Sequence, residues 1–375
     1  MNILHIITSL NDGGAQAVLY NLIKNDVIDK HSVVCLCGEG KYSPKLALLG
    51  IDVLHLDMPR GKIRIGGIKT CFSYMRKDPP DLVQTWMYHS DLVGGLVARV
   101  AGIKKIVWGI HHSSLDKKGT SFTTRLVVAL LRWMSWVIPS SIISCSQRSL
   151  SLHVSMGYDE KKMRFVGNGY DLDQFKPGRG SLDNLDDLPI FPDGAFIFVT
   201  VARWDPQKDH RNLLEAVDLL SDISNHQFVC FFVGPNMNSS NSELRKLIHH
   251  HGVEDRVFLC GSSSNVTDLM NFSDCHILPS AFGEAFPNVV AEALACSVPC
   301  IVTNVGDAAD MVGDYGWVVE PRNPSGLAAA MNEVLEMSNS GENWRLLREK
   351  CRERAIDNLS VQKMIDSYRS VWREA

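Results

Sequence analysis

The chain has 375 residues, 45% of them hydrophobic and 21% charged, which allows two domains with their own cores and excludes disorder as the main state. Its formal net charge of −4 excludes a uniformly basic nucleic-acid-binding surface. The total hides an asymmetry, because residues 1–177 hold 22 basic and 14 acidic side chains, a balance of +8, whereas residues 178–375 hold 16 and 28, a balance of −12. We therefore expect two domains with different partners, neither of them a nucleic acid.

Short apolar runs alternate with amphipathic stretches in the first half of the chain. The amphipathic stretches favour helices, for example at Ala15–Asn25, His89–Ala101 and Ser121–Val137. Continuous apolar strands that are each followed by a helix indicate a parallel sheet covered on both faces. The predicted strands are Ile3–Ile7, Ser32–Leu36, Asp52–Leu56, Asp81–Thr85, Lys105–Ile110, Ser141–Cys145 and Arg164–Val166.

A stretch rich in Gly, Pro, Asp and Asn interrupts this pattern at Asn168–Phe191 and is typical of a linker. A second parallel α/β unit follows it, and beyond about Ser325 the chain is helical, with helices predicted at Glu342–Ala355 and Val361–Arg373. Two doubly wound domains in tandem place a ligand cleft between them, at the carboxyl ends of both sheets. The predicted strands of the second unit are Phe196–Val201, Gln227–Val233, Arg256–Leu259, Cys275–Leu278 and Pro299–Thr303.

The cysteines and the apolar segments indicate a reduced, cytoplasmic protein. The ten cysteines are scattered through apolar stretches, and Cys35/Cys37 and Cys296/Cys300 lack the paired C-x2-C spacing of a zinc framework. We expect ordinary core thiols. The start, MNILHIITSL, has no basic n-region and is typical of a first strand, and no segment reaches the roughly 18 apolar residues of a spanning helix.

A glycine pair, Gly13 and Gly14, follows the first predicted strand and precedes the first helix. Glycines let a ligand approach the backbone, and the helix behind them offers free N–H groups and a positive dipole end. The pair favours contact with a phosphate or an acceptor hydroxyl, although a tight turn would explain it too. The G-x-G-x-x-G spacing of a dinucleotide fold is absent, which excludes an NAD-dependent dehydrogenase.

Two cations follow the first strand of the second unit. Arg203 and Lys208 are five residues apart, after a strand and before a helix, where they can hold a diphosphate from both sides. A solvated loop is the alternative for so short a motif.

Two glutamates, Glu284 and Glu292, are eight residues apart, which is about two turns of a helix. Glu292 falls on an apolar helix face, where a carboxylate needs a polar partner. A ribose diol is such a partner, while the predicted helix start at Ala285–Asn288 can receive a phosphate. A surface salt bridge is the alternative for Glu292, and its apolar neighbours disfavour it.

Together these residues resemble a known family. Arg203 and Lys208, followed by E-x7-E from Glu284 to Glu292, are similar to the retaining glycosyltransferases of family 4, which have the GT-B fold. The resemblance covers nearly the whole chain, since it includes GGAQ at residues 13–16, NGYDLDQF at 168–175 and VPCIVT at 298–303. The segments that begin at Trp86 and Trp108 further resemble members that build bacterial surface polysaccharides.

The resemblance implies an α/β fold of the GT-B type, with two Rossmann-like doubly wound parallel-sheet domains, an interdomain cleft and C-terminal helices. It assigns acceptor binding to residues 1–177, joined by the C-terminal helix 361–375. It assigns binding of the nucleotide-sugar donor to residues 178–360.

The family's site residues carry over one by one. Arg203 and Lys208 would hold the donor diphosphate, Glu284 would face the donor sugar, and Glu292 would bind the ribose hydroxyls. Other donor contacts would come from Ala285, Phe286, Pro287 and Asn288. In the first domain, Gly13 and Gly14 would contact the phosphate or the acceptor, and His111 would contact the sugar. The adjacent His112 is the alternative, and either histidine could instead only support the site.

The implied reaction is a front-face substitution that retains the configuration of the sugar. No residue stands out as a covalent nucleophile, so catalysis would come from positioning and charge stabilisation by Arg203 and Lys208, with Glu284 and His111. No cofactor or metal is expected. Asp171-Leu-Asp173 resembles a D-x-D metal motif, but it lies within the linker motif, and we reject it as a metal site.

Basic residues of the first domain suit an anionic membrane surface or a lipid diphosphate. They form one cluster in residues 59–69 and a second around the Leu126–Ile138 segment, which also holds Trp133 and Trp136. A buried helix with a solvated basic rim is the alternative. The residues are Arg60, Lys62, Arg64 and Lys69 in the first cluster and Lys117, Lys118, Arg125 and Arg132 in the second.

We therefore expect a cytoplasmic glycosyltransferase, peripheral on the inner face of the membrane, that uses a nucleotide-diphosphate sugar. UDP is favoured over GDP, and the expected acceptor is a polyprenyl-diphosphate-linked saccharide of a bacterial O-antigen or capsule. A GT-B-fold nucleotide-sugar 2-epimerase is the first alternative. A non-catalytic nucleotide-sugar-binding assembly partner is the second.

Overall fold

The computed structural model describes residues 1–11, 13–59, 61, 64–111, 121–182, 191–263 and 265–375. They form two compact units, unit 1 (Met1–Gly169 and Val361–Ala375) and unit 2 (Tyr170–Ser360). The chain enters unit 2 before the expected boundary after Pro177, because residues 170–175 bond to unit 2. The Tyr170 N–H donates to the Leu359 carbonyl at 2.8 Å, and the Arg352 guanidinium donates to the carbonyls of Leu172 at 3.0 Å and Phe175 at 2.7 Å.

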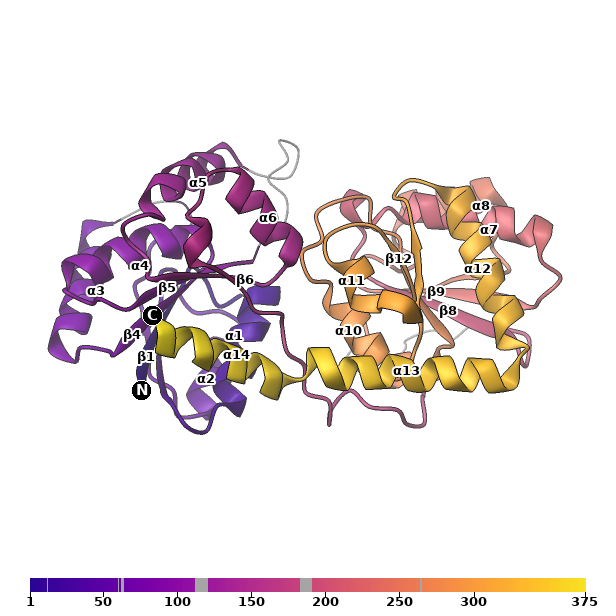
Figure 1. The fold of residues 1–375 in the computed structure, drawn as a ribbon. Coiled ribbons are helices and arrows are strands. Elements are labelled where there is room, and N and C mark those ends of the chain that lie inside the picture. The colour runs from indigo at the N-terminus through magenta and orange to yellow at the C-terminus, as the bar shows by residue number, and fades with distance from the viewer. Residues whose placement is uncertain (12, 60, 62–63, 112–120, 183–190, 264) are drawn as a thin grey trace. The chain divides into compact units, whose positions relative to one another are not determined.

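In its described residues, unit 1 contains a seven-stranded parallel sheet in the order β3-β2-β1-β4-β5-β6-β7 (Figure 1). The strands are β1 (Asn2–Ile7), β2 (Lys30–Cys35), β3 (Val53–His55), β4 (Leu82–Trp86), β5 (Ile106–Ile110), β6 (Ser141–Ser144) and β7 (Met163–Phe165). The helices are α1 (Gly14–Asn25), α2 (Ser43–Leu48), α3 (Ile65–Lys77), α4 (Tyr88–Val100), α5 (Phe122–Met134), α6 (Gln147–Ser155) and α14 (Val361–Glu374).

Both faces of this sheet are buried, as the continuous apolar strands predicted. On β1, Leu4 and Ile6 point to the face covered by α3, α4 and α5, whereas Ile3 and Ile7 point to the face covered by α1, α2 and α14 (Figure 1). Because each strand buries alternate side chains on opposite faces, it needs apolar residues at successive positions.

Helix α14 closes one face of unit 1 although it comes from the end of the chain. Trp372 is fully buried, and its Nε1–H donates to Gln84 Oε1 at 3.0 Å on β4. Arg369 forms ion pairs with Asp26 and Asp29, which follow α1. The apolar stripe of α14 therefore packs against the core of unit 1, and Arg369 holds α14 next to the end of α1.

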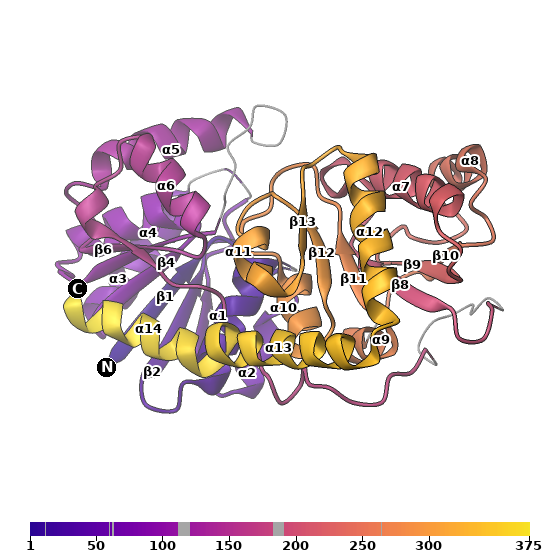
Figure 2. The same cartoon turned by 45° about the vertical axis from the view of Figure 1, so that its right-hand side comes forward.

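Unit 2 repeats this architecture, and its described residues form a six-stranded parallel sheet in the order β10-β9-β8-β11-β12-β13 (Figure 2). The strands are β8 (Phe196–Val201), β9 (Phe228–Val233), β10 (Val257–Leu259), β11 (Cys275–Leu278), β12 (Cys300–Thr303) and β13 (Trp317–Val319). The helices are α7 (His210–Ile223), α8 (Ser242–His251), α9 (Val266–Phe272), α10 (Asn288–Ala295), α11 (Ala308–Val312), α12 (Pro324–Ser338) and α13 (Gly341–Leu359).

The edge strand β13 is the element of unit 2 that the sequence did not predict as a strand. It has three residues and follows Gly316, so it is too short to show a periodic pattern. The cysteines behave as expected, since all ten are free and only Cys37 is not fully buried. None of the helices in the described ranges is both long and apolar enough to span a bilayer.

Candidate donor site in unit 2

Lys208 of the predicted diphosphate motif and Glu284, the predicted sugar contact, meet in unit 2. Lys208 ends a 3₁₀ turn, Pro206–Lys208, after β8, and Glu284 lies in the loop between β11 and α10. Lys208 Nζ is 2.5 Å from Glu284 Oε1, with 13% and 8% of the two side chains exposed. Because little water reaches the pair, its attraction is screened far less than that of a surface salt bridge.

Two hydroxyl groups that the sequence did not single out hold the glutamate in place. Ser280 Oγ donates to Glu284 Oε1 at 2.6 Å, and Thr303 Oγ1 donates to the Ser280 carbonyl at 2.6 Å. Both hydroxyl residues are fully buried at the carboxyl ends of β11 and β12. Their signal in the sequence is a polar residue at the end of an apolar strand, which is too common to identify a site.

The loop of Lys208 and the loop of Glu284 are also joined through Gln207. The Ala281 N–H donates to the Gln207 carbonyl at 2.8 Å, and Gln207 Oε1 accepts a hydrogen bond from Arg203 Nη2 at 3.4 Å. Gly306 packs against the same loop with a φ of 60°, where a Cβ atom would lie 2.4 Å from the Glu284 carbonyl oxygen. Glycine is therefore required at 306 if the Glu284 backbone is to keep its position.

Arg203 is the more exposed of the two predicted diphosphate ligands. Its side chain is 54% exposed, and its Nε lies 3.1 Å from Asp205 Oδ2. Hydrogen bonds to Asp205 and Gln207 thus orient the Arg203 guanidinium. An exposed, oriented guanidinium and a largely buried ammonium five residues further along the chain are suited to a ligand with several anionic oxygens.

Helix α10 begins later than the sequence predicted. Pro287 is its N-cap and Asn288 its first residue, so Ala285 and Phe286 precede the helix. Proline cannot donate a hydrogen bond, and it is suited to the boundary where the chain enters the helix. Asn288 Oδ1 accepts a hydrogen bond from the Tyr170 hydroxyl at 2.7 Å, which ties the helix start to the first residue of unit 2.

Glu292 lies inside α10, between the buried Ala291 and Ala293. Burial raises the pKa of its carboxyl to about 7. Within the part of the chain that the structure describes, no side chain or backbone group donates a hydrogen bond to this carboxylate. A ligand that brings two hydroxyl donors would satisfy it, and a ribose is such a ligand.

The predicted residues of unit 1 lie at the carboxyl edge of its sheet. Gly13 is the N-cap of α1 and Gly14 its first residue, and a Cβ atom on Gly13 would lie 2.4 Å from Gln16 Oε1. His111 follows β5 and stacks on Trp86 at 5.1 Å between ring centroids. Its alternative, His112, lies outside the described residues.

A buried carboxylate that the sequence did not reveal supports this edge. Asp91 Oδ1 accepts hydrogen bonds from Thr85 Oγ1 at 2.6 Å and from the Gly109 N–H at 3.4 Å, on the strands that lead to Trp86 and His111. Burial raises the pKa of the Asp91 carboxyl well above its usual range. The candidate residues thus form two groups, one in each unit.

The D-x-D sequence of the linker forms a turn. Asp171 Oδ1 accepts hydrogen bonds from the N–H groups of Asp173 at 3.1 Å and Gln174 at 3.2 Å. Among the described residues, no three His, Cys, Asp or Glu side chains are placed to share a metal ion. Metal independence nevertheless stays a prediction.

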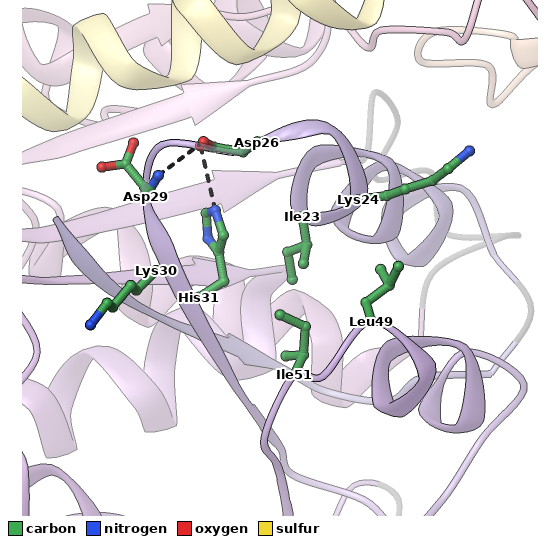
Figure 3. A pocket seen from close by; sticks show the side chains of 8 residues that line it. All are labelled: Ile23, Lys24, Asp26, Asp29, Lys30, His31, Leu49 and Ile51. Atoms are coloured by element: carbon green, nitrogen blue, oxygen red, sulfur yellow. Dashed lines mark hydrogen bonds and ion pairs between the residues drawn. The ribbon is translucent and has the colours of Figure 1, made fainter.

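A pocket of about 450 Å³ lies in unit 1, away from the predicted site residues (Figure 3). Its lining comes from the end of α1 and the loop after it, the start of β2, and the segment between α2 and β3, at the amino edge of the sheet. Asp26 and Asp29 in its wall bind Arg369 of α14, so these carboxylates have a structural role. The lining residues are Ile23, Lys24, Asp26, Asp29, Lys30, His31, Leu49 and Ile51.

Asp209, directly after Lys208, has a left-handed backbone with φ 47° and ψ 48°. Burial also raises the pKa of its carboxyl, so this charge is unfavourable there. We expect Asp209→Gly to raise the free energy of unfolding by about 0.5–1 kcal/mol, because glycine adopts this conformation without strain. Thermal unfolding measures the change, with Asp209→Asn as the control that removes only the charge. A loss of stability in Asp209→Gly would contradict the prediction.

Known proteins share this architecture. The model "Glycosyltransferase Family 4" matches residues 12–174, and the model "Glycosyl transferases group 1" matches residues 186–357. The crystal structure of HepE from Anabaena in complex with UDP is similar with a TM-score of 0.83 at 20% sequence identity, over 100% of both chains. This likeness shows the fold, and the predicted GT-B class is confirmed.

Two relatives match over most of their length. The UDP-Gal:alpha-D-GlcNAc-diphosphoundecaprenol alpha-1,3-galactosyltransferase of Escherichia coli is 22% identical over 314 residues, which are 80% of this chain and 77% of the relative. The putative glycosyltransferase EpsF of Bacillus subtilis is 23% identical over 312 residues, 80% of this chain and 79% of the relative. Since the two family models together match residues 12–174 and 186–357, the chain belongs to the glycosyltransferases, with a family 4 N-terminal part and a group 1 C-terminal part.

Proposed function

We propose that this glycosyltransferase transfers a sugar, with retention and without a metal ion, from a UDP-sugar to a polyprenyl-diphosphate-linked saccharide. The acceptor serves the synthesis of a bacterial surface polysaccharide at the inner face of the cytoplasmic membrane. The contact between Lys208 and Glu284, in the loops that follow β8 and β11, is the observation that carries the proposal. The Escherichia coli relative, named for UDP-Gal and a diphosphoundecaprenol-linked acceptor, supports the choice of donor and acceptor.

The proposed chemistry needs charge stabilisation more than a nucleophile. The bond between the sugar C1 and the diphosphate oxygen breaks, and the acceptor oxygen bonds to C1 on the same face. The acceptor proton passes to the departing phosphate oxygen. Negative charge accumulates on that oxygen, where Arg203 and Lys208 would stabilise it.

Contacts within the protein position the Lys208 ammonium before the donor binds. Glu284 and the 3₁₀ turn hold its ammonium in place, and an ammonium has three N–H donors, of which Glu284 takes one. The others can bind phosphate oxygens without reorganisation of the side chain. Glu284 would border the donor sugar, Glu292 would bind the ribose, and the backbone from Ala285 to Asn288 would line the phosphates.

Ligand-induced stabilisation tests the donor. We expect UDP to raise the melting temperature more than GDP, because a ligand that binds only the folded state stabilises it by about 2.7 kcal/mol at a hundredfold excess over its Kd. UDP-glucose, UDP-galactose and UDP-N-acetylglucosamine, each alone, would then rank the sugars. Stabilisation by GDP and not by UDP would overturn the choice of base.

A transfer assay tests the reaction. With undecaprenyl-diphosphate N-acetylglucosamine as acceptor, the product should have the anomeric configuration of the donor in its NMR coupling constants. Activity should survive EDTA, and a loss restored by Mg²⁺ or Mn²⁺ would refute metal independence. Conversion of a UDP-sugar to its C2 epimer without acceptor would instead support an epimerase, and donor binding without turnover would support an assembly partner.

A further inference from the structure

Helix α5 of unit 1 has two apolar faces, and only one of them is buried. Val128 and Leu131 pack into the core beneath the helix. On the other side, Phe122, Leu126, Leu130 and Trp133 are 46–74% exposed. Their spacing of three and four residues places them in one stripe along the helix. The turn after the helix continues the stripe, and we define the α5 surface as Phe122, Leu126, Leu130, Trp133, Trp136 and Val137.

Cationic side chains accompany this apolar stripe. The Arg132 guanidinium lies 4.6 Å from the Trp133 ring centroid, and the Arg125 guanidinium lies 5.8 Å from that of Phe122. At the end of the helix, Lys162 Nζ donates to the carbonyls of Ser135 at 2.9 Å and Trp136 at 2.8 Å. Arg99 donates to the carbonyl of Ile138 in the same turn.

Acidic side chains are missing from this part of the sequence. Residues 121–158 contain no Asp or Glu, and the carboxylate of Asp159 is paired with Lys162 at 3.8 Å. The α5 surface thus combines exposed tryptophans and leucines with two arginines whose guanidinium groups lie over aromatic rings of the same surface. Apolar side chains with a border of cations match the acyl chains and anionic headgroups at the surface of a membrane.

We propose that the α5 surface docks the enzyme on an anionic lipid bilayer, with Trp133 and Trp136 at the level of the headgroups. The inference rests on the proposed function only in that a polyprenyl-linked acceptor lies in a membrane. A bilayer fits the surface better than a second copy of the chain does. A two-fold contact through α5 would bring Arg125 and Arg132 of both copies together, with no carboxylate on the helix to separate them.

Vesicle binding tests the docking. Full-length protein is mixed with vesicles of phosphatidylcholine alone or with about 30% phosphatidylglycerol, and the bound fraction is measured by flotation. We expect the anionic vesicles to bind at least about tenfold more strongly, and the difference to shrink in high salt. Arg125→Gln/Arg132→Gln should remove most of that difference. Trp133→Ser/Trp136→Ser should weaken binding to anionic vesicles about tenfold.

Matched controls separate docking from folding and from catalysis. Val27→Ser/Ile28→Ser removes two apolar side chains that are 90% and 68% exposed elsewhere on unit 1, and it should bind vesicles like the wild type. All variants should keep the wild-type melting temperature shift with UDP. They should also keep the transfer rate to a water-soluble, short-chain acceptor, so failure of docking and failure of the proposed function give different results.

Three outcomes would overturn the proposal. The wild type could bind neither kind of vesicle, or the tryptophan variant could bind as well as the Val27/Ile28 control. Alternatively, light scattering could show a dimer that only the tryptophan variant dissociates, which would identify the α5 surface as an interface between copies. A blue shift of tryptophan fluorescence that is present with anionic vesicles and lost in Trp133→Ser/Trp136→Ser would support the proposal.

Discussion

Replacing Lys208 with methionine is expected to lower kcat/KM by about a thousandfold, the loss typical of a preorganised group that stabilises charge in the transition state. Methionine keeps much of the length of the side chain and removes its charge. Of the two cations proposed to stabilise the departing diphosphate, Arg203 would then remain, and Arg203 is far more exposed to water than Lys208. Charge stabilisation by an exposed group is weaker because solvent screens it.

The same substitution should destabilise unit 2. Glu284 would remain almost buried without its cation, which costs about 3–5 kcal/mol at neutral pH. The double variant Lys208→Met/Glu284→Gln should regain most of this stability, because a neutral amide can keep a contact with Ser280 without a buried charge. It should not regain activity, so folding and catalysis can be separated.

Urea unfolding and steady-state kinetics measure the two effects. Lys246→Met, at an exposed lysine of α8, is the matched control and should leave both unchanged. The role of Lys208 in the reaction would be refuted if the folded double variant kept kcat/KM within about tenfold of the wild type.

Glu292→Gln is expected to stabilise the protein at pH 8 and to weaken its binding of UDP. The pKa of the carboxyl is about 7 in the folded protein, against an ordinary value of 4.5. A raised acid pKa means that the folded state binds more protons than the unfolded state between these values. This group's contribution to stability is therefore complete below pH 4.5 and is lost as the pH rises to about 7.

The substitution removes that pH-dependent loss. We expect a gain of about 1–3 kcal/mol at pH 8 and little change near pH 4.5, since each pKa unit corresponds to about 1.4 kcal/mol. The affinity for UDP should fall about 10–100-fold, because an amide accepts fewer hydrogen bonds from two ribose hydroxyls than a carboxylate does.

Urea unfolding at several pH values and calorimetric titration with UDP measure the two effects. Burial lowers the pKa of His210 and His276 to about 3, but both histidines are present in the variant too, so the difference between variant and wild type isolates Glu292. Glu342→Gln, at an exposed residue in the first turn of α13, is the control. Equal stability of Glu292→Gln and the wild type at pH 8 would contradict the burial of this charge, and unchanged UDP affinity would contradict its binding role.

Much of the fold could be predicted because each strand of a doubly covered parallel sheet is apolar at successive positions. The runs at Ile3–Ile7 and Phe196–Val201 show this directly, and both became central strands. The short β13 shows the limit, since three residues at a sheet edge have no period to detect. The start of α10 shows another, because the backbone leaves the loop only after Pro287.

The candidate site, like the fold, could be predicted only in part from the sequence. Arg203, Lys208, Glu284 and Glu292 could be named from the sequence because the members of each pair are close together in the chain. The contact between Lys208 and Glu284 could not, since 76 residues separate them. Ser280 and Thr303 were missed because a buried hydroxyl acquires a role only from the groups that the fold places beside it.

The sequence by itself determined the fold class, the presence of two α/β units and the family, because these depend on local periodicity and on motifs that are contiguous in the chain. Only the tertiary structure decided which charges meet and where unit 2 begins. It also showed that one apolar face of α5 stays exposed while the other is buried. These features depend on side chains that are distant in the sequence, and only the packing of the chain brings them together or leaves them open to solvent.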